Sequence, residues 1–445
     1  MWALSSPRHS GNRPGAQRGS IRPLAWQAEN FFDCFFAVGA IVASLYWQRC
    51  RICTSTFVVI LGEGSTRPII RIAICEEGEA MSSKLSVSII GAGNTGCTFA
   101  ADLASRGIDV LLYGHPKHRG NIDAIRKKGC LASRMEIEGE FNPTLTTEMA
   151  DAVQFSHFLV VTVPSYGHAD IINDLKGFDL SNHVIVVING NFFALLSPNE
   201  LNAQAILETN ASPYASWVKD GEVSITGVKS SLPIAALPNN MGEKQWSQIS
   251  EIFPKTLLWC NNVFEIGMQS NNGVIHPAAG ILNTGWIESR KGDFLFYRDG
   301  ISPSVGNVIE AVDAERLKIA EAFGFRLQTV LQEMVGFYGG ACETFSDFAS
   351  QTKVHNAHKI TPTHMQDRYV SEDVPYILVP WYELGSRVEV QAPTIKAVVD
   401  IASVINGVDY FKSGRNLKRL GMDHMSKTEL LRFIDSATCH LPWAR

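Results

Sequence analysis

The chain has 445 residues, of which 45% are hydrophobic and 19% charged, and its formal net charge is −5. This composition is that of a globular protein large enough for two domains. The small negative charge excludes a general attraction to nucleic acid or anionic membranes, so we expect no nucleic-acid partner. Nine cysteines without repeated metal-ligand spacing predict free thiols, a reducing compartment and no metal site.

The first 82 residues need a separate interpretation. Residues 1–30 are rich in arginine and serine, which is typical of a targeting peptide. Residues 31–47 are mostly apolar, but Asp33 disfavours a membrane anchor. The third interpretation is that residues 1–82 are an extension outside the fold, because Met81 stands just before a domain-opening strand. We favour this one, and we expect a cytoplasmic protein that meets a membrane only if 31–47 is a real anchor.

A predicted strand at residues 85–90 runs directly into the sequence GAGNTG. Gly91 would allow a tight turn, Gly93 would let the backbone approach a pyrophosphate, and Gly96 would let the next helix pack closely. That helix, at about 95–106, would hold the phosphates with its free N–H groups. A chance glycine turn is the alternative, but the strand before and the helix after favour a dinucleotide-binding site. The remaining candidate contacts of this loop are Asn94 and Thr95.

The elements that follow predict an α/β fold. Strands separated by helices indicate a parallel sheet with helices on both faces, and a purely helical pattern begins near residue 260. We therefore predict an N-terminal Rossmann dinucleotide-binding domain (83–258), an all-α domain (259–438) and a tail (439–445). The expected elements are strands at 110–113, 158–163, 184–188, 223–228 and 257–259, a hairpin at 135–145, and helices at 121–129, 308–323 and 393–405.

The end of the second strand bears on the choice of cofactor. In NAD-binding sites an acidic residue near this point holds the ribose 2′-hydroxyl. Here Tyr113 is followed by Lys117 and Arg119, with no acid between. These two cations could pair with a 2′-phosphate, so the sequence favours NADPH over NADH; the alternative is that both are solvated loop residues.

Two segments of the helical part carry groups suited to proton transfer and anion binding. His276 lies in an apolar, helical stretch, where it is either a general acid/base or a core residue. The segment 367–375 combines arginine, tyrosine and acids. Arg368 could clamp a substrate carboxylate, and an aspartate beside His276 would hold its tautomer. A charged surface turn is the alternative for this segment.

With these motifs in place, the chain resembles the opine dehydrogenases, the family of octopine, nopaline and N-(1-carboxyethyl)norvaline dehydrogenases. The resemblance runs from about residue 84 to 437. Its most specific pieces are IHP at 275–277 and RYVSEDVP at 368–375. The other matching pieces are GAGNTG at 91–96, Val163-Pro164, Glu208-Thr209, the run from Phe296 to Val305, the run from Val312 to Arg316, Gly414-Arg415 and Leu420-Gly421.

The resemblance implies an activity and assigns roles. An amino acid and a 2-oxo acid such as pyruvate would condense to an imine, which NAD(P)H reduces to an opine. The family's catalytic pair falls on His276 and Asp373, its carboxylate-binding arginine on Arg368, and a substrate-contacting threonine on Thr209. Val163 and Pro164 are the further cofactor contacts that it implies.

Two loops depart from the family pattern. Both are expected to line the substrate cleft, which makes Asn191 a candidate substrate contact. The aromatic residues of these loops would make the cleft more aromatic, or else pack beneath it as ordinary core. They are Phe192, Phe193, Tyr214 and Trp217.

Two other functions remain open from the sequence. One is the NADP-dependent reduction of a simple 2-oxo acid or ketone, as in the glycerol-3-phosphate and ketopantoate reductase group. That group tends to rely on a lysine acid, and no lysine stands beside His276 or Asp373. The other is a non-catalytic NADP-binding sensor, which would need neither residue.

Overall fold

A computed structural model of the chain describes residues 57–62, 69–74, 84–197, 200–237, 241–253, 255–357 and 361–436. Contacts divide the chain into two units, Met1–Ser83 and Lys84–Arg445. In the first unit, β1 (Phe57–Gly62) and β2 (Ile69–Ile74) form an antiparallel pair. The candidate anchor at 31–47 and the tail at 439–445 lie outside the described residues.

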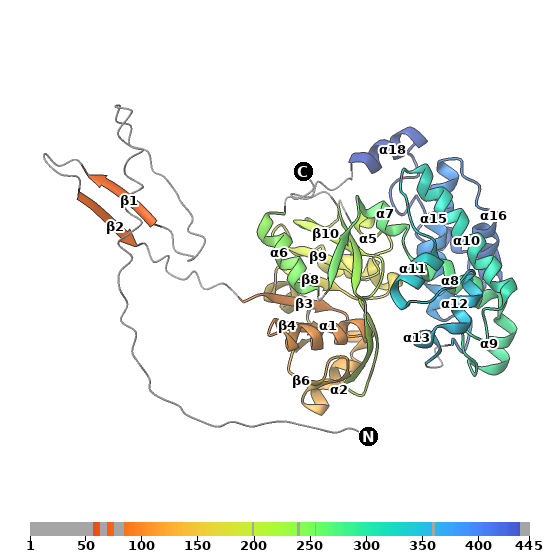
Figure 1. Ribbon diagram of the computed structural model, residues 1–445, viewed down its shortest axis with the longest axis horizontal. Coiled ribbons are helices and arrows are strands. Elements are labelled where there is room, and N and C mark those ends of the chain that lie inside the picture. The colour runs from red at the N-terminus through yellow and green to blue at the C-terminus, as the bar shows by residue number, and fades with distance from the viewer. Residues whose placement is uncertain are drawn as a thin grey trace, which may run out of the picture. The chain divides into compact units, whose positions relative to one another are not determined.

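The second unit contains an eight-stranded sheet in the order β14-β13-β10-β9-β8-β3-β4-β7 (Figure 1). From β7 to β10 all neighbours are parallel and follow the Rossmann order 3-2-1-4-5-6. β13 runs antiparallel to β10, and β14 runs parallel to β13. The strands are β3 (Ser86–Ile90), β4 (Asp109–Tyr113), β7 (Thr144–Thr146), β8 (Phe158–Val161), β9 (Val184–Val187), β10 (Ala205–Thr209), β13 (Ser231–Ala236) and β14 (Thr256–Trp259).

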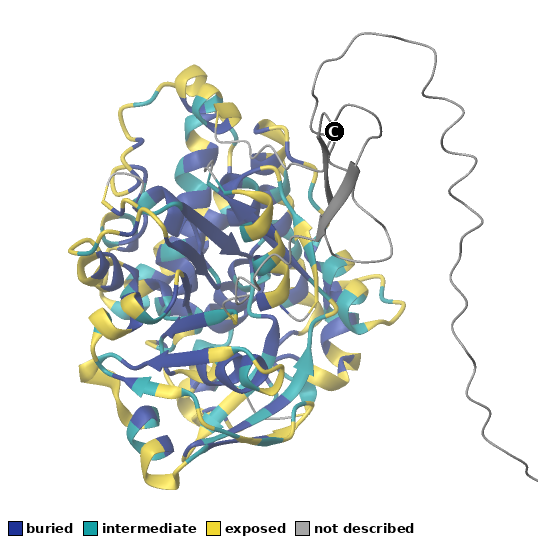
Figure 2. Cartoon of the chain, turned by 90° about the vertical axis from the view of Figure 1, so that its left-hand side faces the viewer, coloured by how far each residue is buried: buried dark blue, intermediate teal, exposed yellow. Residues whose placement is uncertain are grey.

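The central strands are apolar along their whole length because both faces of the sheet are covered. In β8, Leu159 and Val161 join the core that continues into the helical half, whereas Phe158 and Val160 join a second core with α1. Figure 2 shows these strands as buried. The helices of this half are α1 (Asn94–Ser105), α2 (Gly120–Lys128), α3 (Met149–Phe155), α4 (His168–Leu175), α5 (Phe193–Leu196) and α6 (Glu243–Ile252), with short turns η2 (Pro116–His118) and η3 (Ser165–Gly167). The predicted α/β class is confirmed.

A second, four-stranded sheet corrects two details of the sequence analysis. Its order is β11 (Tyr214–Lys219), β12 (Glu222–Val228), β5 (Leu131–Met135) and β6 (Gly139–Phe141). The hairpin predicted at 135–145 is therefore displaced: β5 pairs with β6, and the next strand joins the main sheet. The strand predicted at 223–228 lies in this second sheet. Short, weakly alternating segments do not specify their partners, so the tertiary structure decides the pairing.

After β14 the described chain is helical. Ser302 caps α10, and Pro303 occupies the first turn of that helix. Pro393 likewise occupies the first turn of α16. Within the described residues, no helix is long and apolar enough to cross a membrane. The helices are α7 (Val263–Gly267), α8 (Asn271–Leu282), α9 (Thr284–Arg290), α10 (Pro303–Ala322), α11 (Val330–Tyr338), α12 (Phe345–Gln351), α13 (Lys353–Asn356), α14 (Arg368–Ser371), the wide turn η4 (Val374–Leu378), α15 (Val379–Arg387), α16 (Pro393–Asn406), α17 (Tyr410–Ser413) and α18 (Lys427–Ser436).

Candidate active site

The glycine loop has the geometry that its sequence predicts. Gly91 has φ +120°, a conformation that L side chains rarely adopt. A Cβ on Gly96 would lie 1.8 Å from the Gly91 carbonyl oxygen, so α1 can approach β3 only with glycine there. Among the described residues, nothing lies within 4 Å of the position of a Cβ on Gly93, and no side chain caps the start of α1. The N–H groups of its first turn therefore remain available to a phosphate.

The neighbouring residues hold this loop in place. Asn94 accepts a hydrogen bond from the Val218 backbone N–H at 2.9 Å, and the Thr95 hydroxyl lies 3.5 Å from that of Ser212. The ring of Tyr113 is buried in the core, and burial raises the pKa of its hydroxyl to about 12. Tyr113 thus meets the loop through its backbone carbonyl, which accepts from Gly91 N–H at 3.0 Å.

The two cations after β4 are exposed on η2 and the start of α2. Arg119 forms a two-point ion pair with Asp123, with distances of 2.8 and 3.0 Å. The backbone N–H of Lys117 donates to His115 Nδ1. Across the loop, Val163 packs at 3.0 Å from the position that a Cβ on Gly91 would occupy. Pro164 precedes η3, so both residues follow directly after β8.

His276 and Asp373 lie together. His276 Nδ1 is 2.8 Å from Asp373 Oδ2, and both side chains are almost completely buried. The imidazole stacks on Tyr369 at a centroid distance of 3.8 Å, and Phe296 packs against its edge. Within the described residues Nε2 makes no hydrogen bond. The aspartate therefore fixes the orientation of the ring and leaves Nε2 for a reacting group.

Arg368 lies one turn before Asp373, with Nε 3.4 Å from the carboxylate of Glu372. That carboxylate also accepts from the Ser165 backbone N–H at 2.8 Å, just after Val163-Pro164. Burial raises the pKa of Glu372, and the Arg368 guanidinium opposes the increase. Sequence reasoning gave Glu372 no role. Glu372 joins the helical half to the nucleotide half, and the same carboxylate holds Arg368.

Thr209 and the loop after β9 occupy the carboxyl ends of the neighbouring strands. The Thr209 hydroxyl donates to the Ala211 carbonyl at 2.9 Å and accepts from the Asn189 N–H at 3.3 Å. Asn191 donates to the Ser165 hydroxyl at 3.0 Å. Asn189, Asn191 and Phe192 all have positive φ. Such strain persists only where surrounding contacts enforce it, and it is concentrated at functional sites.

For three of the four loop aromatics the structure favours the second alternative, ordinary packing in the core. Phe192 and Phe193 are fully buried in the core. Tyr214 packs on Phe99 of α1 and donates to the Asp102 carboxylate at 2.8 Å. Trp217 is 38% exposed on β11. The sequence pattern could not separate these cases, because whether an aromatic residue faces a cleft or the core depends on the tertiary fold.

Two buried charges that the sequence analysis left without a role fix the loop after β9. The Glu208 carboxylate accepts from the backbone N–H groups of Phe192 and Ala194 at 2.9 and 2.6 Å. Burial raises the pKa of Glu208 to about 7. Arg415 reaches the same loop from the helical half and donates to the carbonyls of Gly190 and Asn191. The Glu-Thr and Gly-Arg motifs were visible in the sequence, but this contact across the two halves was not.

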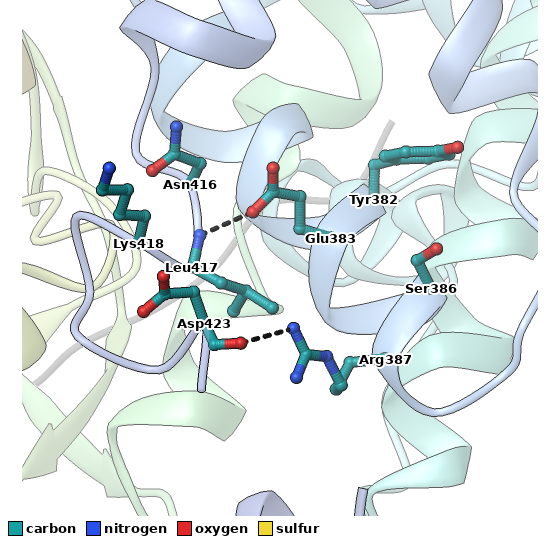
Figure 3. Close-up of a pocket in the computed structure, with 8 residues that line it drawn as sticks. All are labelled: Tyr382, Glu383, Ser386, Arg387, Asn416, Leu417, Lys418 and Asp423. Carbon is teal, nitrogen blue, oxygen red and sulfur yellow. Dashed lines mark hydrogen bonds between the residues drawn. The ribbon is translucent and has the colours of Figure 1, made fainter. Parts of the chain in front are cut away.

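A cavity of about 490 Å³ lies elsewhere, between α15 and the 416–423 loop (Figure 3). Its polar groups hold that loop: Glu383 accepts from the Leu417 N–H at 2.6 Å, and Arg387 donates to the Asp423 carbonyl at 3.0 Å. None of the site residues predicted from the sequence lines it. Among the described residues, no group of three or more potential metal ligands is found.

Comparisons with known proteins identify both halves. Residues 259–406 match the family described as NAD/NADP octopine/nopaline dehydrogenase, alpha-helical domain. Residues 87–239 match ketopantoate reductase PanE/ApbA. The chain is 30% identical to Protein ocs of Agrobacterium tumefaciens (strain Ach5) over 78% of its own length and 99% of that protein. It is also 30% identical to the opine dehydrogenase of Arthrobacter sp. (strain 1C), covering 78% and 98%.

Solved structures share the fold. The octopine dehydrogenase complex with NADH and L-arginine has a TM-score of 0.64 at 16% identity, covering 78% of this chain and 98% of that one. The yersinopine dehydrogenase with bound NADP+ has a TM-score of 0.60 at 13% identity, covering 80% and 98%. The resemblance inferred from the motifs is confirmed: the chain belongs to the octopine/nopaline (opine) dehydrogenase family of NAD(P)-dependent oxidoreductases, which act on CH–NH groups.

Proposed function

We propose that this protein uses NAD(P)H to reduce the imine formed between a 2-oxo acid, such as pyruvate, and an amino acid. The observation that carries the proposal is the buried His276–Asp373 pair, whose Nε2 has no partner within the described residues. Related structures support the substrate classes. Octopine dehydrogenase has been solved with NADH and the amino acid L-arginine, and with NADH and the 2-oxo acid pyruvate.

His276 moves the protons in this proposal. With Nδ1–H directed at Asp373, neutral Nε2 accepts a proton as the amine adds to the carbonyl carbon. The resulting imidazolium returns that proton to the alkoxide oxygen, which gives the neutral carbinolamine. A second proton, taken up by Nε2 from solvent and passed to the hydroxyl, lets it leave as water while the nitrogen lone pair forms the protonated imine. The carboxylate of Asp373 stabilises the imidazolium without taking its proton. The bound cofactor supplies the hydride that reduces the imine carbon.

Arg368 is the proposed carboxylate ligand. Its guanidinium is half-exposed, so it can bind an anion while Glu372 holds Nε. Thr209 and Asn191 are proposed to border the substrate, because both lie at the carboxyl edge of the sheet, where open α/β sheets bind their ligands. Their side chains are tied to the surrounding loops, so we assign them to shaping the cleft wall.

The glycine loop and the residues around it are the proposed cofactor site. The open space above Gly93 and the uncapped start of α1 fit a pyrophosphate. Lys117 and Arg119 are proposed to face the 2′-phosphate of NADPH, since no acid stands between the end of β4 and Arg119 to hold a 2′-hydroxyl. The family includes structures with each cofactor, NADH in one case and NADP+ in the other. The remaining proposed contacts are Gly91, Asn94, Thr95, Gly96, Tyr113 through its backbone, Val163 and Pro164.

One assay separates the three candidate functions. NADPH and NADH oxidation is measured with pyruvate alone and then with a panel of amino acids added. We expect turnover only when an amino acid is present. Equal turnover without an amine would support a simple 2-oxo acid reductase, and cofactor binding without any turnover would support a sensor.

A histidine pair tests the catalytic assignment. We expect His276→Ala to abolish amine-dependent turnover while NADPH still binds, because the glycine loop is untouched. His424→Ala is the matched control, since that imidazole is 72% exposed. Retained activity in His276→Ala would remove this residue from its proposed role.

A further inference from the structure

Lys229 lies at the turn between β12 and β13, beside the cofactor loop. Its backbone N–H donates to the Pro213 carbonyl at 2.9 Å. The preceding residue of that loop, Ser212, contacts Thr95 at the start of α1. The backbone of Lys229 therefore belongs to the nucleotide half, close to the end of the sheet where the cofactor is proposed to bind.

The side chain of Lys229 reaches the helical half. Its ammonium nitrogen lies 5.3 Å from the ring centroid of Phe337 on α11. Burial lowers the pKa of Lys229 to about 8, and the charge of Glu333, one turn before Phe337 on α11, opposes the decrease. Within the described residues, the ammonium makes no hydrogen bond or close ion pair. Glu333 is near enough for its charge to act on the ammonium, but no anion of the described residues lies within hydrogen-bonding distance of it, so a ligand carboxylate could supply that contact.

The surroundings of His355 connect Lys229 with the catalytic histidine. Burial, followed by the charges of His276 and Lys229, lowers the pKa of His355 to about 4. The His355 ring lies 4.4 Å from that of Tyr297 and 4.8 Å from that of Tyr338. Ring contacts continue in both directions: Tyr297 packs on Phe296, which packs on the His276 ring, and Tyr338 packs on Phe337, which lies under the Lys229 ammonium. Phe337 of α11 lies against the ammonium, the charge of Glu333 on the same helix acts on it, and the charge of Lys229 in turn acts on His355 of α13.

The chemistry of an opine requires two anion sites. Its secondary amine is flanked by two carboxylates, one from the oxo acid and one from the amino acid. Arg368 adjoins Tyr369, which stacks on His276, and it serves one of them. Within the proposed function, we infer that Lys229 binds the α-carboxylate of the amino acid substrate. It thereby positions the amine for attack on the carbonyl carbon beside His276.

Kinetics with Lys229→Met test this role. A hydrogen bond to a charged group corresponds to a change of about 10- to 150-fold, so KM for the amino acid should rise by that factor. The Kd for NADPH should stay near that of the parent, and Lys229→Arg should restore KM. The matched control is Lys244→Met on α6, where the lysine is exposed. Melting temperatures establish that each variant is folded.

Two further readouts distinguish carboxylate binding from a structural role. The parent should prefer an amino acid over its decarboxylated amine, and Lys229→Met should lose that preference. Because the ammonium is charged only below about pH 8, KM in the parent should rise above that pH. Lys229→Arg keeps its positive charge as the pH rises. The ratio of the parent's KM to the KM of Lys229→Arg therefore cancels the effect of the substrate's own ionisation on KM.

The outcomes separate this inference from the proposed function. If the parent shows no amine-dependent turnover, the proposed function fails and the inference falls with it. If the parent turns over but Lys229→Met keeps both KM and the carboxylate preference, the inference alone is wrong. Weakened NADPH binding at unchanged KM would assign Lys229 to the cofactor and would also overturn it.

Discussion

Replacing Arg415 with methionine should remove a buried polar link between the two halves of the second unit. Its guanidinium donates to the backbone carbonyls of Gly190, Asn191 and Ser165, and to Nδ1 of His168 at 3.1 Å. The side chain is 2% exposed. Methionine retains much of the apolar packing but leaves these acceptors without a donor.

The magnitude follows from the acceptors that would be left behind. Leaving one buried acceptor without a donor costs about 1–3 kcal/mol, so loss of the bonds to the Gly190 and Asn191 carbonyls should lower the unfolding free energy by about 2–6 kcal/mol. The Arg415 charge also acts on Glu208, whose carboxyl burial makes harder to ionise and Arg415 makes easier. Without that charge, its pKa should rise above the value of about 7 found in the parent.

The sign of the pH dependence follows from the same carboxyl group. The pKa of Glu208 is higher in the folded than in the unfolded state. Glu208 therefore contributes fully to stability at pH values below its pKa in the unfolded state. This contribution is lost as the pH rises through its pKa in the folded state. In Arg415→Met the folded-state pKa of Glu208 is higher still, so this loss of stability continues to higher pH. The difference in unfolding free energy between parent and variant should be smallest near pH 5 and should grow through pH 7 to 9.

Urea unfolding at pH 5, 7 and 9 measures this difference. Arg298→Met is the control, because its exposed ion pair with Asp299 is worth at most about 1 kcal/mol. Adding Glu208→Gln to Arg415→Met should remove the extra pH dependence. A loss below about 1 kcal/mol, or a difference that shrinks as pH rises, would refute the reasoning.

Three further predictions concern the catalytic pair and the cofactor loop. Asp373→Asn should lower kcat about 100-fold or more with little change in the Kd for NADPH, and an unchanged kcat in steady-state assays would contradict the pairing. Lys117→Ala combined with Arg119→Ala should weaken NADPH at least about 10-fold more than NADH in fluorescence titrations; equal weakening would count against the 2′-phosphate site. Gly96→Ala places a methyl group 1.8 Å from a carbonyl oxygen, so it should lower both the melting temperature and the affinity for either cofactor. Gly120→Ala, where the space is open, should change neither.

The accuracy of the sequence predictions follows the range of the interactions. The strand, glycine turn and helix from β3 to α1 are adjacent in the chain, so local conformational preferences predict them together. The pairing of β12 with β5 joins segments about 90 residues apart, and nothing in the sequence of either strand specifies the other as its partner. His276 and Asp373 are separated by 97 positions, so only the family resemblance indicated that they meet.

The sequence by itself determined the Rossmann class, the glycine loop, the helical second half and the family, because these depend on local patterns and contiguous motifs. The tertiary structure decided which polar residues work together. It assigned Glu372 and Arg415 to the junction between the halves, and it placed the Lys229 ammonium against Phe337 of the helical half. It also placed Phe192 and Phe193 in the core. These choices depend on long-range packing, in which burial and charge are set by segments that are distant in the chain.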